Sequence, residues 1–97
     1  MGKNNTRFKD VKSFGQSLGL NHFEMELILE KKKLIEKLKK AREKQGLTQS
    51  DLARIVGSQQ PAISRMESGQ VSEVSLDFLC KVAFALGVSV TIKGKVA

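Results

Sequence analysis

The stretch that decides the fold runs from Leu47 to Gly69 and reads LTQSDLARIVGSQQPAISRMESG. It predicts two short helices joined by a tight turn. Thr48 stands where a hydroxyl can cap the first helix, and Asp51 follows at the spacing of a capping box. Gly57 suits the left-handed residue that ends a helix, so the first helix is expected to stop there.

Apolar residues at helical spacing predict the buried sides of both helices. They are Leu52, Ile55 and Val56 in the first helix, and Ile63 and Met66 in the second. The second helix must begin near Gln59 or Gln60, because Pro61 is tolerated only in a first turn, where backbone N–H groups have no partner within the helix. Gly69 is expected to end the second helix. This is the layout of a helix-turn-helix, whose second helix enters the major groove of DNA.

The stretch resembles the helix-turn-helix of Cro/CI-type (XRE-type) regulators, which are similar to phage repressors. The resemblance covers about residues 34–87 and lies in four matching pieces: AREKQGLTQ (41–49), LA (52–53), ISRMESG (63–69) and ALGV (85–88). It implies that Gln49 and Gln70 touch phosphates, and that Gln60, Ser64 and in some members Arg65 reach base edges. It also implies an ion pair between Arg42 and Glu67 that holds the family's first and third helices together.

Two positions depart from the family pattern. The family usually has Ser or Thr at the cap where this chain has Gln59, and often an apolar residue where it has Ser58. Because Gln is a weaker cap than Ser, the start of the second helix and the identity of the glutamine that meets DNA stay open. The candidate DNA-binding residues are Gln49, Ser58, Gln59, Gln60, Ser64, Arg65 and Gln70. Arg65 has an alternative role as a surface residue or the partner of a nearby acid, and the whole motif could be a helical bundle that only packs this way.

Charge is concentrated just before this motif. The chain has 97 residues and a formal net charge of +7, with a pI of about 9.8. The segment from Lys31 to Lys44 holds eight basic residues against Glu36 and Glu43, which is a net +6. A basic run of this kind attracts phosphates without reading sequence. The alternative is a solvated helix face, so we expect only a minority of these lysines to approach DNA.

Several classes of function are disfavoured by composition. One cysteine and one histidine, Cys80 and His22, form neither a disulfide framework nor a recognisable metal site. Cys80 is expected to pack in the core, and His22 to cap a helix or lie on the surface. No nucleophile motif, phosphate loop or membrane-spanning run stands out. We therefore expect no enzyme activity, no cofactor, no metal and no membrane association, and a cytoplasmic, nucleoid-associated location for a bacterial or phage protein.

The N-terminal part is expected to form an arm and then a long helix. Residues 1–22 are the arm, with a possible short helix that begins after Asp10 and closes at Gly19. Asn21 and Glu24 resemble a capping box, opening a helix that continues to about residue 45. Its apolar stripe is Leu27, Leu34, Leu38 and Ala41. The run from Lys31 to Lys33 interrupts this stripe, which leaves room for a kink.

The C-terminal part predicts a helix and then a strand. Ser75 can cap a helix from Leu76 to Leu86, which is apolar on two faces: one has Leu76, Leu79, Ala83 and Leu86, and the other has Phe78, Val82 and Ala85. Val88 to Lys93 alternates and is rich in β-branched residues, as strands are. A lone strand needs a partner, and the simplest is the same strand of a second copy. The candidate dimerisation residues are Phe78, Val82, Val88, Val90 and Ile92. A frayed tail is the alternative.

These patterns predict a mostly α fold, a repressor-like helix-turn-helix bundle whose C-terminal β-strand pairs across a homodimer. The expected divisions are an arm (1–22), a DNA-binding domain (23–87) and a dimerisation strand with its tail (88–97). The expected function is sequence-specific regulation of transcription, with double-stranded DNA and a second copy as partners. The terminal strand resembles antitoxins of the HigA and HipB types, so the alternative is an antitoxin that neutralises a cognate toxin protein and represses its own operon. RNA binding is disfavoured because no aromatic stacking platform is visible.

Overall fold

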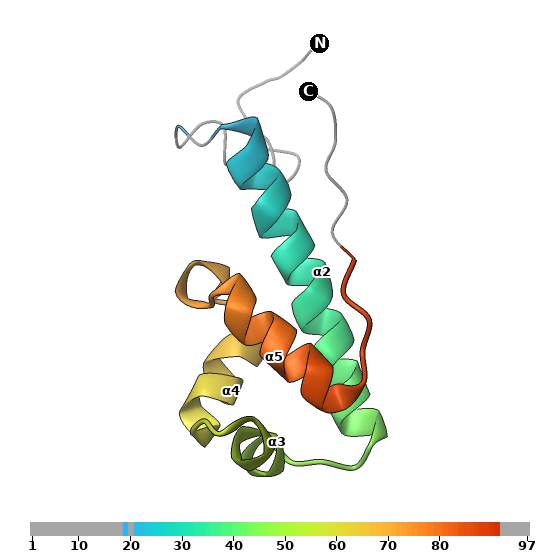
Figure 1. The fold of residues 1–97 in the computed structure, drawn as a ribbon. Helices are drawn as coiled ribbons and strands as arrows, with labels where there is room; N and C mark the ends of the chain where they lie inside the picture. The colour runs from blue at the N-terminus through green and yellow to red at the C-terminus, as the bar shows by residue number, and fades with distance from the viewer. Residues whose placement is uncertain (1–18, 20, 92–97) are drawn as a thin grey trace.

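The computed structural model describes Gly19 and residues 21–91, in which the shorter helices pack against one long helix (Figure 1). In chain order the elements are α2 (His22–Lys44), α3 (Gln49–Val56), α4 (Gln60–Glu67), the 3-10 turn η1 (Val71–Glu73) and α5 (Leu76–Leu86). α5 crosses α2, while α3 and α4 close the bundle near the C-terminal end of α2. The mostly helical prediction is confirmed for these residues, whereas the short helix predicted after Asp10 lies outside them.

The long helix begins as predicted and runs without a break. The side chain of Asn21 accepts from the backbone N–H of Glu24 at 2.8 Å, and the Glu24 carboxylate accepts from the Asn21 N–H at 2.9 Å. The helix continues through Lys31–Lys33 to Lys44 with no kink assigned there. Its N-terminal part projects beyond the other described helices (Figure 1). Leu27 is 43% exposed on this projecting part, so its predicted place in the buried stripe is wrong.

The two helices of the deciding stretch form with the predicted ends. Thr48 and Asp51 make a reciprocal capping box at 2.9 Å in each direction. Gly57 ends α3 with φ of 70°, in the left-handed region where other residues are strained. α4 starts at Gln60 with Pro61 in its first turn, and its N-cap residue, Gln59, makes no side-chain hydrogen bond to the helix. The missing hydrogen bond agrees with the weak capping that the sequence predicts for Gln59.

The core lies between α2 and the three shorter helices. Its buried apolar residues are Leu34, Ile35 and Leu38 of α2, Leu52, Ala53 and Val56 of α3, Ile63 and Met66 of α4, Val74, and Leu79, Val82, Ala83 and Leu86 of α5. Two sequence predictions are corrected here. Ile55 is 54% exposed, because the buried face of α3 turns toward Ala53 instead. Val82 is fully buried within its own chain, so it cannot contact a second copy.

The predicted C-terminal helix forms, and the chain then turns back along α2. Ser75 caps α5 by accepting from the N–H of Phe78 at 3.1 Å, and Gly87 ends the helix with φ of 70°. Residues 88–91 run beside α2, where the Nζ of Lys37 donates to the carbonyl oxygen of Ser89 at 3.2 Å (Figure 1). These four residues form no strand within the described chain, and the rest of the predicted strand, Ile92 and Lys93, lies outside the described part.

Candidate nucleic-acid interface

A buried ion pair forms the base of the candidate site. Arg42 of α2 donates from Nε to Oε2 of Glu67 at 2.7 Å and from Nη2 to Oε1 at 3.0 Å. Its Nη1 donates to the carbonyl oxygen of Leu47, at 2.6 Å, just before α3. The Glu67 side chain is 3% exposed and that of Arg42 is 11% exposed. The structure thus forms the contact that the family resemblance implies, and the pair joins α2 to the end of α4.

The ion pair keeps both groups charged. Burial of the Glu67 carboxyl would by itself raise its pKa, but hydrogen bonds from Arg42 and Gln49 and the nearby charges of Arg42 and Lys39 lower the pKa below its ordinary value. The hydrogen bond to Glu67 raises the pKa of Arg42, against the opposing effect of burial. Glu67 is therefore a carboxylate that can only accept hydrogen bonds.

Two glutamine side chains extend this contact to the surface. The Nε2 of Gln49, the first residue of α3, donates to Oε1 of Glu67 at 3.0 Å. The Nε2 of Gln60, the first residue of α4, donates to Oε1 of Gln49 at 2.7 Å. Gln49 is half-buried and Gln60 is exposed. We call the chain Arg42–Glu67–Gln49–Gln60 the amide relay. The sequence named all four residues, but it gave no signal that they form one chain of hydrogen bonds.

The remaining candidate residues lie on or beside α4. Gln59 and Arg65 are exposed, Ser58 and Ser64 are half-buried, and Gln70 is exposed in the turn after α4. Among the described residues Arg65 forms no ion pair, so the alternative of an acidic partner for Arg65 has no support here. Arg65 and Glu73 both line a shallow hollow between α4, η1 and α5. Amide, hydroxyl and guanidinium groups are thus gathered on one helix, and these are the groups that read base edges in the major groove.

The basic helix contributes less free charge than the sequence indicates. Lys31 donates from Nζ to the carbonyl oxygen of Val74 at 2.7 Å, and so holds the segment between η1 and α5. Lys37 holds Ser89 in the same way. Lys33 pairs with Glu30 at 3.5 Å, on the solvent side. Two of the lysines expected to attract phosphates therefore also bind carbonyl oxygens of their own chain.

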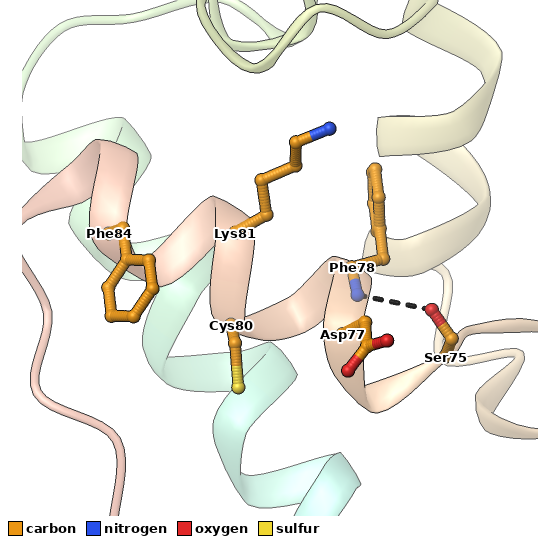
Figure 2. A pocket seen from close by; sticks show the side chains of 6 residues that line it. All are labelled: Ser75, Asp77, Phe78, Cys80, Lys81 and Phe84. Atoms are coloured by element: carbon orange, nitrogen blue, oxygen red, sulfur yellow. Dashed lines mark hydrogen bonds between the residues drawn. The ribbon is translucent and has the colours of Figure 1, made fainter.

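A second surface lies on the outer side of α5, and sequence reasoning missed its main residue. Phe84 is 81% exposed, and it lies between two shallow hollows that share Cys80 and Phe84 in their lining. Figure 2 shows Phe84, Cys80 and Phe78 along this helix, with Asp77 and Lys81 beside them. Cys80 is only half-buried here, so its predicted place in the core is wrong. Phe84 belongs to neither apolar face predicted for the helix, which is why the pattern did not mark it.

Metal-ligating clusters and membrane-spanning helices are both missing from the described residues. These residues contain no group of three or more His, Cys, Asp and Glu side chains that could hold a metal ion. Within the same residues, no helix is both long and apolar enough to span a membrane. His22 opens α2 but does not cap it, and its ring lies edge-on to Phe23 with the centroids 5.4 Å apart.

The sequence model of a family described as a helix-turn-helix domain matches residues 20–95, which is most of the chain. No curated protein and no solved structure matches.

Proposed function

The chain belongs to the helix-turn-helix domain family, and we propose that it is a sequence-specific transcriptional regulator that binds double-stranded DNA. The observation that carries the proposal is the outward face of α4. Its first side chain, Gln60, is exposed and is already held in one orientation by Gln49. A side chain that is ordered before binding loses less conformational freedom when it meets a base.

The proposed contacts divide into two sets. Gln60, Ser64 and Arg65 read base edges, with Gln59 and Ser58 at the helix start as further candidates. Gln49 and Gln70 flank α4 in space and contact phosphates, which set the position of the protein on the duplex. A glutamine suits adenine, which offers one donor and one acceptor in the major groove. Arg65, which has no ion-pair partner among the described residues, suits guanine.

We propose that two copies bind a palindromic operator and repress by blocking the polymerase, in the cytoplasm. Two recognition helices would then reach successive major grooves, about 34 Å apart. Support for a dimer comes from the apolar side chains along one edge of the molecule: Phe84 and Phe78 on α5, and Val88 and Val90 in the segment that follows. The proposed dimer surface includes Phe84, which is exposed, and leaves out Val82, which is buried. The segment Val88–Lys93 of one copy would pair as a strand with the same segment of the other copy.

The test is selection of bound duplexes from a random DNA pool, followed by affinity measurements on the selected site. We expect a two-fold symmetric site that binds at least about a thousandfold more tightly than random DNA. Gln60→Ala should weaken discrimination at one base pair of each half-site. Ser50→Ala, at an exposed position of α3, is the matched control and should leave discrimination intact. Equal affinity for selected and random duplexes would contradict the proposal.

An antitoxin is the second candidate, and one observation favours it. The projecting part of α2 carries Phe23, which is 68% exposed, and Leu27, which is 43% exposed. This apolar surface lies away from α4, so a protein could cover it while DNA is bound. Co-expression with the product of a small reading frame beside the gene tests this candidate. Neutralisation of that product by the wild type, and loss of neutralisation in Phe23→Glu with DNA binding intact, would support it.

A further inference from the structure

The amide relay has only one possible direction of hydrogen bonding. Glu67 is a buried carboxylate, so both of its oxygens accept and neither donates. Gln49 can therefore approach Glu67 only with its Nε2, which donates at 3.0 Å. This leaves Oε1 of Gln49 toward Gln60, and an oxygen can only receive a donor. Gln60 must accordingly point its own Nε2 at Gln49, as it does at 2.7 Å.

This direction limits what Gln60 can offer to a base. A glutamine amide carries two N–H donors and one acceptor oxygen. One N–H of Gln60 is used by Gln49, so one donor and one acceptor remain on the exposed side. Adenine presents an acceptor at N7 beside a donor at N6, which fits this pair. Guanine presents two acceptors, N7 and O6, and the oxygen of Gln60 would face one of them.

We infer that the buried Glu67, acting through Gln49, fixes the donor and acceptor directions of Gln60 and so makes this position select adenine over guanine. The inference rests on the proposed function and adds to it the residues that set base specificity without touching the base themselves. Gln49 and Glu67 are positioning residues in this scheme, while Gln60 touches the base. A Gln60 freed from the relay can turn its amide over, or can give both N–H groups to guanine.

Two variants of Gln49 separate these possibilities. Wild-type protein should prefer adenine over guanine by roughly 5- to 150-fold at the base pair that Gln60 reads. Gln49→Ala removes the acceptor, frees both N–H groups of Gln60, and should reduce this ratio to within about threefold. Gln49→Lys places a donor-only ammonium between Glu67 and Gln60. Gln60 must then turn its oxygen inward and expose both N–H groups, so the preference should reverse toward guanine.

The base pair is identified with Gln60→Ala, which should abolish the preference there and nowhere else. Ser50→Lys is the matched control for the added charge, because Ser50 is exposed on the same first turn of α3 and takes no part in the relay. It should raise the affinity for all duplexes and leave the ratio of adenine to guanine unchanged. A shift of the ratio in Ser50→Lys equal to that in Gln49→Lys would overturn the inference.

A measurement without DNA tests the relay by itself. In NMR spectra of the free protein, one side-chain amide proton of Gln60 should exchange slowly with water, and it should lose this protection in Gln49→Ala. An unprotected Gln60 amide in the wild type would overturn the inference and leave the proposed function standing. Unchanged base ratios in both Gln49 variants would do the same. No base preference at any position in the wild type would overturn the inference together with the proposed function.

Discussion

Glu67 is the residue at which three helices meet. It lies at the end of α4, accepts two hydrogen bonds from Arg42 of α2, and accepts a third from Gln49 of α3. Hydrogen bonds that involve a charged group are the stronger kind, and a buried charge without its partner is costly. The fold and the proposed recognition surface therefore depend on the same carboxylate.

Replacing Glu67 by Ala should destabilise the protein by about 3–5 kcal/mol, because Arg42 is left buried without its counter-charge. The free energy of unfolding is measured by urea denaturation at neutral pH. Glu73→Ala is the control, since Glu73 is exposed, and it should change stability by less than about 0.5 kcal/mol. Equal stabilities of the two variants would show that the ion pair does not hold the bundle together.

The same carboxylate predicts how stability depends on pH. Because the folded state lowers the pKa of Glu67, this group stabilises the fold fully above its ordinary pKa of 4.5, and the contribution is lost as pH falls through the lower, folded value. Stability of the wild type should thus fall on acidification below about pH 4.5. In Glu67→Gln the fall should be shallower over the same range, because the amide does not titrate. Parallel curves for the two proteins would contradict this assignment.

Among the helices, the difference in capping separates α4 from the others. α2 and α3 begin with complete capping boxes, and α5 begins with Ser75, whereas the N-cap of α4 makes no side-chain hydrogen bond. The sequence predicted the starts of α2, α3 and α5, because caps depend on residues three apart in the chain, but it left the start of α4 open between Gln59 and Gln60. It misplaced Ile55, because one apolar residue at helical spacing does not say on which side the neighbouring helix lies.

A better cap on α4 should stabilise the protein. Gln59→Ser places a hydroxyl where it can accept from an early N–H of α4, and the expected gain is about 0.5–1 kcal/mol. The comparison is Thr48→Ala, which removes an existing cap and should cost about 1 kcal/mol. Thermal or urea unfolding measures both. A Gln59→Ser protein that is less stable than the wild type would mean that Gln59 makes contacts beyond those of a cap.

Considered as a whole, the molecule presents two separate surfaces, the α4 face and the apolar edge at α5. The helical bundle could be predicted from the sequence, because caps, glycines and apolar spacing agree along most of the chain. The edge was predicted only in part: Phe78, Val88 and Val90 were named, but Phe84 is outside every predicted face. Val82 was included wrongly, because the packed core covers it. The amide relay could not be predicted, since its residues meet only after α2, α3 and α4 have packed.

The proposed dimer makes a prediction at this scale. Phe84→Glu places a charge at the centre of the apolar edge and should shift sedimentation from dimer toward monomer, with weaker binding to a two-fold site. Phe23→Glu is the matched control, since Phe23 is also exposed but lies on the projecting part of α2. It should leave the dimer unchanged. A wild type that sediments as a monomer at all concentrations would contradict the proposed dimer.

The contacts of Lys31 and Lys37 bear on how DNA affinity responds to salt. The dependence of affinity on salt concentration reports how many small cations leave the DNA when positively charged side chains replace them at phosphates. A lysine that stays on a carbonyl oxygen of its own chain releases none, and Lys31 and Lys37 hold Val74 and Ser89. A plot of log affinity against log salt concentration should then have a shallower slope than expected if every basic residue of α2 contacted a phosphate. Lys37→Gln should leave that slope unchanged, even though it removes one positive charge.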